Sequence, residues 1–68
     1  MLDFGVNIIS TRMDLKLFTD STYQNKVYNA LQRARKEREI TDKHSMACYE
    51  DCIVVKDQNK NIIAIKKF

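Results

Sequence analysis

The chain has 68 residues, of which 44% are hydrophobic and 31% charged, and its formal net charge is +3. These values are typical of one folded domain over residues 1–68 with a small core, and they exclude an intrinsically disordered chain. The sequence shows neither a signal peptide nor a run of about 20 apolar residues that would span a membrane, so we expect a cytoplasmic protein with reduced cysteines.

Two segments near the N-terminus alternate apolar with polar residues. Apolar side chains occupy every second position over residues 2–8 and again over residues 13–17. A period of two predicts two strands, and the polar residues 10–12 between them predict an antiparallel hairpin. Because this turn contains no glycine, a single bent strand or a short N-terminal helix also fits the pattern.

The segment 21–40 organises the rest of the chain. Its apolar residues recur at helical spacing within roughly 100° of arc, which predicts an amphipathic helix. Ser21 is the expected N-cap, Gln24 completes a capping box, and Asp20 places negative charge at the positive end of the helix dipole. The predicted apolar face consists of Tyr23, Val27, Ala30, Leu31 and Ala34.

The polar side of the same segment is basic. Residues 21–40 contain five basic and two acidic side chains, so they account for the net charge of the whole chain. This surface could bind phosphate groups or an acidic protein, or it could be a solvated helix face whose cations lie near the negative end of the dipole. Lys26, Arg33 and Lys36 form one ridge, while Arg35 and Arg38 flank the apolar face from the other side.

The character of the chain changes after Ile40, where the apolar helical spacing stops. Thr41 could cap a second short helix with Asp42 in its first turn. Residues 41–49 could equally form a loop that runs directly into a strand. The sequence leaves both interpretations open.

One set of side chains could bind a metal ion or take part in catalysis, namely His44, Cys48 and Cys52. Their spacing of four residues would align three soft metal ligands on a continuous helix, but a zinc site needs four ligands and the C-x2-C pair of zinc modules is absent. A catalytic Cys–His pair is disfavoured because no oxyanion-hole turn accompanies either thiol. We therefore expect no metal, no cofactor and no enzymatic activity, with the cysteines serving as small buried hydrophobes.

The last two apolar runs predict the clearest hairpin in the chain. Residues 52–56 and 61–66 are rich in β-branched side chains and flank a polar turn. Asn59 or Asn61 is expected to adopt the left-handed conformation that glycine usually provides. Because the apolar runs are nearly unbroken, we expect one face to meet the helix and the other to meet a second protomer or a binding partner.

Two lysines, Lys66 and Lys67, end the last predicted strand just before the C-terminal residue. Charged side chains on an edge strand discourage pairing with other chains. We therefore interpret these lysines as protection of a sheet edge.

These elements predict an α+β fold with the order ββα(α)ββ. Two hairpins would form one antiparallel sheet, and the main helix would lie across one of its faces. A sheet of this size covered on one side leaves its other side exposed, which favours a homodimer.

Elimination and surface composition together favour a binding function. A chain of this length seldom encloses a pocket, whereas Tyr28 lies outside the apolar stripe beside Arg35, a combination typical of interface hot spots. We predict a small protein-binding module, such as a regulator or inhibitor of a larger protein, that uses Lys26, Tyr28, Arg33, Arg35, Lys36 and Arg38.

The alternative function is nucleic-acid binding through the ridge of Lys26, Arg33 and Lys36. Two features of the chain count against it. Nine acidic residues dilute the positive charge, and no predicted strand carries the aromatic residues of an RNA-recognition motif.

Overall fold

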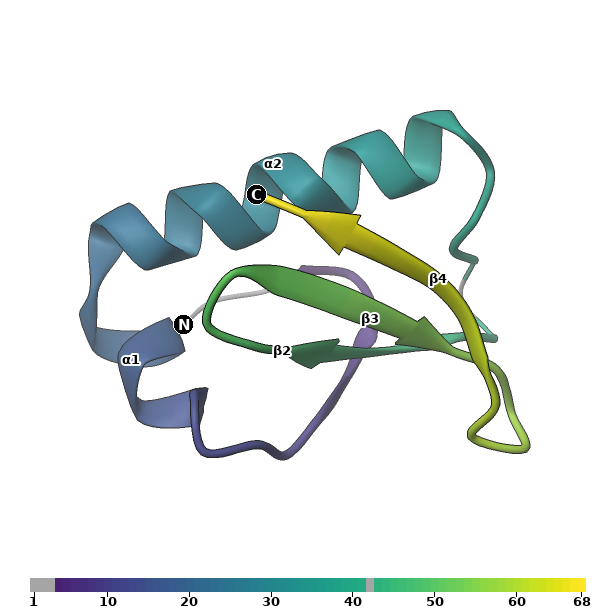
Figure 1. Cartoon of the computed structure of the whole chain (residues 1–68), viewed down its shortest axis with the longest axis horizontal. Helices are drawn as coiled ribbons and strands as arrows, with labels where there is room; N and C mark the ends of the chain where they lie inside the picture. Colours follow the sequence, from purple (N-terminus) through teal and green to yellow (C-terminus); the bar gives the residue numbers. More distant parts are fainter. Residues whose placement is uncertain (1–3, 42) are drawn as a thin grey trace.

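The computed structural model describes residues 4–41 and 43–68 as a four-stranded sheet with two helices on one side (Figure 1). The strands lie in the sheet in the order β1-β2-β3-β4, which is also their order along the chain. The elements are β1 (Asn7–Ile9), α1 (Asp14–Thr19), α2 (Ser21–Lys36), β2 (Ser45–Cys48), β3 (Cys52–Lys56) and β4 (Ile62–Lys67).

The α+β class is confirmed, but the sheet is mixed and does not consist of two hairpins. β1 pairs with β2 in parallel, whereas β2–β3 and β3–β4 are antiparallel. Parallel neighbours need a long crossover connection, and here α1 and α2 together supply it. The predicted strand over residues 2–8 corresponds to the shorter β1, and its first two residues lie outside the described part of the chain.

The predicted second strand over residues 13–17 is wrong, because these residues belong to helix α1 and the turn before it. The alternative of a short N-terminal helix is the one that holds. Leu17 is fully buried, whereas Leu15 is 75% exposed, so the alternation did not mark a buried strand face. A local signal was present in Thr11 and Asp14, where the Asp14 carboxylate accepts the Thr11 backbone N–H at 3.2 Å, as in one half of a capping box.

Helix α2 begins one residue earlier than predicted, at Ser21 itself. The carboxylate of Asp20 accepts the backbone N–H groups of Thr22 and Tyr23 at 2.9 and 3.3 Å, so Asp20 is the N-cap and Ser21 is the first helical residue. Both residue types cap helices well, but a charged acceptor also interacts favourably with the helix dipole.

Substitution at these two positions should separate their roles. We expect Asp20→Ala to lower the free energy of unfolding by about 1 kcal/mol, because two backbone donors lose their acceptor. Ser21→Ala should change the stability by less than about 0.5 kcal/mol, as is usual for exposed positions. Urea denaturation followed by circular dichroism measures both changes, and a larger loss for Ser21→Ala would reject Asp20 as the cap.

Helix α2 ends at Lys36, four residues before the predicted end at Ile40. The backbone N–H groups of Arg38 and Glu39 donate to the carbonyls of Arg35 and Ala34, a pattern known as a Schellman motif. Arg38 takes the left-handed conformation this motif requires, with φ of 58°. The chain therefore turns back, and Ile40 enters the core at 6% exposure.

The predicted apolar face of α2 is confirmed as the centre of the core. Its five residues are at most 3% exposed and belong to one cluster of buried side chains. The opposite wall of this cluster comes from alternate positions of β2 and β3, as expected for strands with one face toward a helix. The sheet residues in this wall are Met46, Cys48, Ile53 and Val55.

The described residues among 41–49 do not form the predicted second helix. Residues 43–44 lead into β2, which supports the alternative of a loop followed by a strand, and the proposed first-turn residue Asp42 lies outside the described part of the chain. β2 is held between β1 and β3, and this pairing on both sides accounts for the strand.

The C-terminal hairpin of β3 and β4 is confirmed. Its left-handed residue is Lys60, with φ of 65°, and neither asparagine takes that role. The Asp57 carboxylate accepts the backbone N–H groups of Asn59 and Asn61 at 2.8 and 2.9 Å, which organises the turn without glycine.

Candidate interaction surface on helix α2

The six residues predicted to bind a partner are all solvent-exposed. Tyr28 is 49% exposed, which leaves about half of a large aromatic side chain on the surface. Lys26 and Arg33 lie seven residues apart and hence on one flank of α2, while Tyr28 and Arg35 lie seven residues apart on the other flank. The structure therefore spreads the predicted residues over both flanks and the C-terminal end of the helix.

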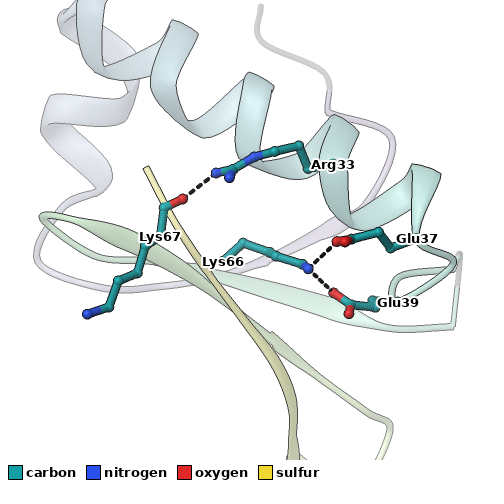
Figure 2. Close-up of polar contacts among 5 residues, drawn as sticks. All are labelled: Arg33, Glu37, Glu39, Lys66 and Lys67. Atoms are coloured by element: carbon teal, nitrogen blue, oxygen red, sulfur yellow. Dashed lines mark hydrogen bonds and ion pairs between the residues drawn. The ribbon is translucent and has the colours of Figure 1, made fainter.

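Two of the six residues also connect α2 to other parts of the fold. The Arg33 guanidinium donates to the Lys67 carbonyl at the end of β4, as Figure 2 shows. The Arg35 guanidinium donates to the Phe4 carbonyl near the N-terminus. These arginines tie the two ends of the described chain to opposite flanks of the helix.

Gly5 allows this close approach of Arg35. The φ of Gly5 is 71°, and a Cβ atom built there would lie 2.7 Å from a terminal nitrogen of the Arg35 guanidinium. Any other residue would meet both backbone strain and a collision with the arginine. The single glycine of the chain is thus placed where the chain passes beside Arg35.

Lys66 forms the ion pairs found among the described residues (Figure 2). Its ammonium contacts the Glu37 carboxylate and lies 2.6 Å from Oε2 of Glu39, and the Lys66 side chain is only 16% exposed. Glu39 Oε2 is buried, and the contact with the Lys66 ammonium compensates its charge. The hydrogen bond from Lys66 lowers the pKa of Glu37, and the same contact raises the pKa of Lys66. Lys66 therefore faces α2 and does not guard the sheet edge as a solvated charge.

An open surface depression lies between the end of α2 and β4. Its volume is about 470 Å³, and its walls are Arg33, Lys36, Glu37 and Lys66. Lys66 and Glu37 neutralise each other, so Arg33 and Lys36 are the two cations of the depression that can attract a negatively charged group. Carboxylates of another protein are suited to arginine and lysine donors of this kind.

Two cations of α2 and one in the turn that follows it remain available for a partner. Lys26, Lys36 and Arg38 are exposed, and none of them takes part in the ion pairs found over residues 4–41 and 43–68. Exposed lysine and arginine side chains without a partner gain interactions when an acidic surface binds.

The three metal-ligand candidates do not share a helix face. Cys48 ends β2 with its side chain in the core, Cys52 begins β3, and His44 precedes β2. In addition, Nδ1 of His44 accepts the backbone N–H of Thr41 at 3.2 Å. The described residues contain no group of three or more His, Cys, Asp or Glu side chains that could hold a metal ion.

The thiols are also poorly suited to nucleophilic chemistry. Burial, and secondarily the negative charge of Asp14, raise the pKa of Cys48 to about 12. Burial also raises the pKa of Cys52, with a further contribution from its hydrogen bond to Asp51. Since the thiolate is the reactive form, both cysteines are protonated and weakly nucleophilic near neutral pH.

Comparisons with known protein families, curated proteins and solved structures find no match to this chain. In the described part of the chain, neither helix is both long enough and apolar enough to cross a membrane. The functional argument therefore depends on the residues of this molecule.

The sequence analysis does not predict two of the exposed apolar side chains. Leu15 and Phe18 lie three residues apart on α1 and are 75% and 56% exposed. Because residues 13–17 were interpreted as a strand, these side chains were assigned to the wrong kind of element. The spacing of Leu15 and Phe18 is the helical signal that would have revealed an apolar pair on one face.

Proposed function

We propose that this protein is a non-enzymatic protein-binding module, acting as a regulator or inhibitor of a larger protein, and that it engages an acidic surface through α2. The observation that carries this proposal is the exposed combination of Tyr28 with Lys26, Lys36 and Arg38, in which the three cations have no ion-pair partner among the described residues. Tyrosine and arginine are enriched where protein interfaces derive most of their affinity.

The rigidity of α2 supports this proposal. One face of the helix is buried, its N-terminus is capped by Asp20, and its C-terminus ends in a Schellman motif. Side chains on a fixed helix lose less conformational entropy on binding than side chains on a loop. The helix therefore presents its cations and Tyr28 in a defined arrangement.

The nucleic-acid alternative has less support from the geometry. The Arg33 guanidinium is engaged by the Lys67 carbonyl, and Glu37 lies in the same depression as Arg33 and Lys36. A carboxylate within a phosphate-binding ridge opposes phosphate contacts. A mobility-shift titration at low salt tests this alternative, and we expect no retarded complex with DNA or RNA.

The proposed function is tested by affinity purification from the native host with matched variants. We expect Tyr28→Ala and Lys36→Ala each to reduce recovery of the specific partner by about tenfold, the loss typical of a hot-spot residue. Tyr49→Ala and Lys43→Ala are the controls, because they remove an exposed aromatic ring and an exposed cation away from α2. Circular dichroism establishes that all four variants are folded.

The two pairs of variants have different expected effects on partner recovery. Equal losses for the α2 variants and the control variants would show a nonspecific dependence on charge and aromatic content. Full partner recovery with both α2 variants would reject the helix as the binding surface.

A further inference from the structure

β4 forms one edge of the sheet and is its longest strand, with six residues. The opposite edge is β1, which has only three residues. An edge strand presents unpaired backbone N–H and C=O groups that another strand can use. Among the described strands, β4 is therefore the better template for strand addition.

The hydrogen-bond pattern shows which groups of β4 point outward. The Phe68 N–H donates to the Asp51 carbonyl at 3.0 Å, and the register continues with Lys66 opposite Ile53. In an antiparallel pair, bonded positions alternate with positions whose N–H and C=O point away. Ile65 and Lys67 are the outward positions. The Lys67 carbonyl already accepts Arg33, so the backbone groups of Ile65 and the N–H of Lys67 are the ones that an added strand could use.

The side chains of β4 differ on its two faces. Ile65 pairs with Val54 and is 56% exposed, and Ile62 pairs with Lys56 and is 59% exposed. Ala64 packs against the core, and Lys66 reaches the glutamates at the end of α2. On β4, the face away from the helices therefore carries exposed isoleucines, and the face toward the helices carries Ala64 and the charged Lys66.

The charged side of the β4 edge carries a net charge of only +1, from Arg33, Lys36 and Lys66 against Glu37 and Glu39. Arg33 and Lys36 line the depression that also contains Glu37 and Lys66. Figure 2 shows Arg33 reaching from α2 to the end of β4. A strand added beside β4 would place every second side chain beneath these cations and the remaining side chains beside Ile65. The surface therefore fits a strand that alternates acidic with apolar residues.

We propose that the outward edge of β4 binds an extended acidic segment of the partner protein as a fifth strand of the sheet. Glutamate or aspartate residues of this segment face Arg33 and Lys36, and its apolar residues extend the surface formed by Ile62 and Ile65. This assignment rests on the proposed protein-binding function and specifies the chemistry of the partner. Backbone hydrogen bonds supply affinity, and the alternating side chains supply specificity.

A second copy of β4 is a poorer occupant of the same edge. The strand reads Ile-Ile-Ala-Ile-Lys-Lys and contains no carboxylate. Antiparallel pairing of two copies would place the lysines at the end of each strand beside the isoleucines at the start of the other. The cations at the β4 edge would then meet no carboxylate of the added strand, whereas an acidic segment supplies one, which favours an acidic partner over a homodimer.

The test uses a capped synthetic peptide of alternating glutamate and valine, a sequence-matched peptide of alternating lysine and valine, and the full-length protein. Backbone amide exchange measured by NMR should show fast exchange at Ile65 and Lys67 in the unliganded protein. The glutamate peptide should slow exchange at both amides, and the lysine peptide should leave them unchanged. Raising the salt concentration should weaken binding, because the contacts to Arg33 and Lys36 are electrostatic.

Two variants of Ile65 isolate the backbone contribution. Ile65→Pro removes the outward N–H, which is the position where an edge strand tolerates proline, and should weaken peptide binding by about tenfold. Ile65→Val keeps the N–H and should bind like the wild type. If the proline variant does not fold, amide exchange in the wild-type protein still decides the result.

Three results would overturn the proposal. They are no protection at Ile65 and Lys67 with the glutamate peptide, equal binding of the lysine peptide, or protection of both amides by self-association of the protein alone. If any of these occurs while Tyr28→Ala still abolishes partner binding, the strand-addition proposal fails and the α2 function stands. Loss of partner binding with Ile65→Pro and Lys36→Ala but not with Tyr28→Ala would support strand addition at β4 and reject Tyr28 as a contact.

Discussion

Replacing Leu31 with alanine should destabilise the protein by roughly 3 kcal/mol, the usual cost of a cavity at a fully buried leucine. Leu31 is 0% exposed and belongs to the cluster between α2 and the sheet. A domain of this size is expected to have a total stability of only about 3–10 kcal/mol. Leu31→Ala should therefore remove between about a third and all of the stability of the fold.

Leu15→Ala provides the matched control, because it makes the same chemical change at a side chain that is 75% exposed. Its stability should stay within about 0.5 kcal/mol of the wild type. Chemical denaturation gives both values. Similar losses in the two variants would mean that α1 is packed against another surface or that α2 does not cover the sheet.

Alkaline pH should destabilise the protein, because two groups in its core stay protonated in the folded state. Burial raises the pKa of Cys48 to about 12, and burial followed by the nearby Cys48, Cys52 and Asp14 raises the pKa of Tyr23 to about 12. The Tyr23 hydroxyl also donates to the Tyr49 carbonyl at 2.6 Å, a bond that requires its proton. Both groups are thus held neutral in the folded protein.

The direction of the effect follows from proton binding. Above pH 9 the unfolded chain releases the Cys48 proton, and above pH 10 it releases the Tyr23 proton, while the folded protein retains both until about pH 12. Stability falls with rising pH where the unfolded state binds fewer protons, at about 1.4 kcal/mol for each pKa unit. We expect a loss on the order of 3 kcal/mol by pH 11.

Thermal denaturation at a series of pH values from neutral to strongly alkaline measures this loss. Cys48→Ala should move the onset of the fall from the region of the Cys48 thiol to that of the Tyr23 hydroxyl, about one pH unit higher. An unchanged onset in this variant would show that another group controls alkaline unfolding.

The central helix was predictable because its signals are local and redundant. All five residues of the predicted apolar face are buried, since a repeated spacing over four turns leaves few other arrangements. Its ends were less predictable. Asp20 and Ser21 are adjacent and both residue types cap helices well. The left-handed conformation after the helix is taken by Arg38, whereas glycine or asparagine is the residue type that predicts it.

The first half of the sheet could not be derived from local pattern. Met13, Leu15 and Leu17 occupy every second position, as in a short strand. Leu15 and Phe18 lie three residues apart, as on one face of a short helix. The pairing of β1 with β2 joins residues 38 positions apart, such as Asn7 with Ser45, and no local spacing encodes it. The exposure of the six proposed partner-binding residues follows from the helical spacing, whereas the contacts of Arg33 and Arg35 with the chain ends depend on tertiary structure.

The most direct test of the central claim is NMR mapping of the isotope-labelled protein with the partner recovered from the native host. We predict that binding perturbs the signals of Tyr28, Lys36 and neighbouring positions of α2. Perturbations confined to the turns around Lys43 and Tyr49, with α2 unchanged, would contradict recognition through the exposed side of this helix.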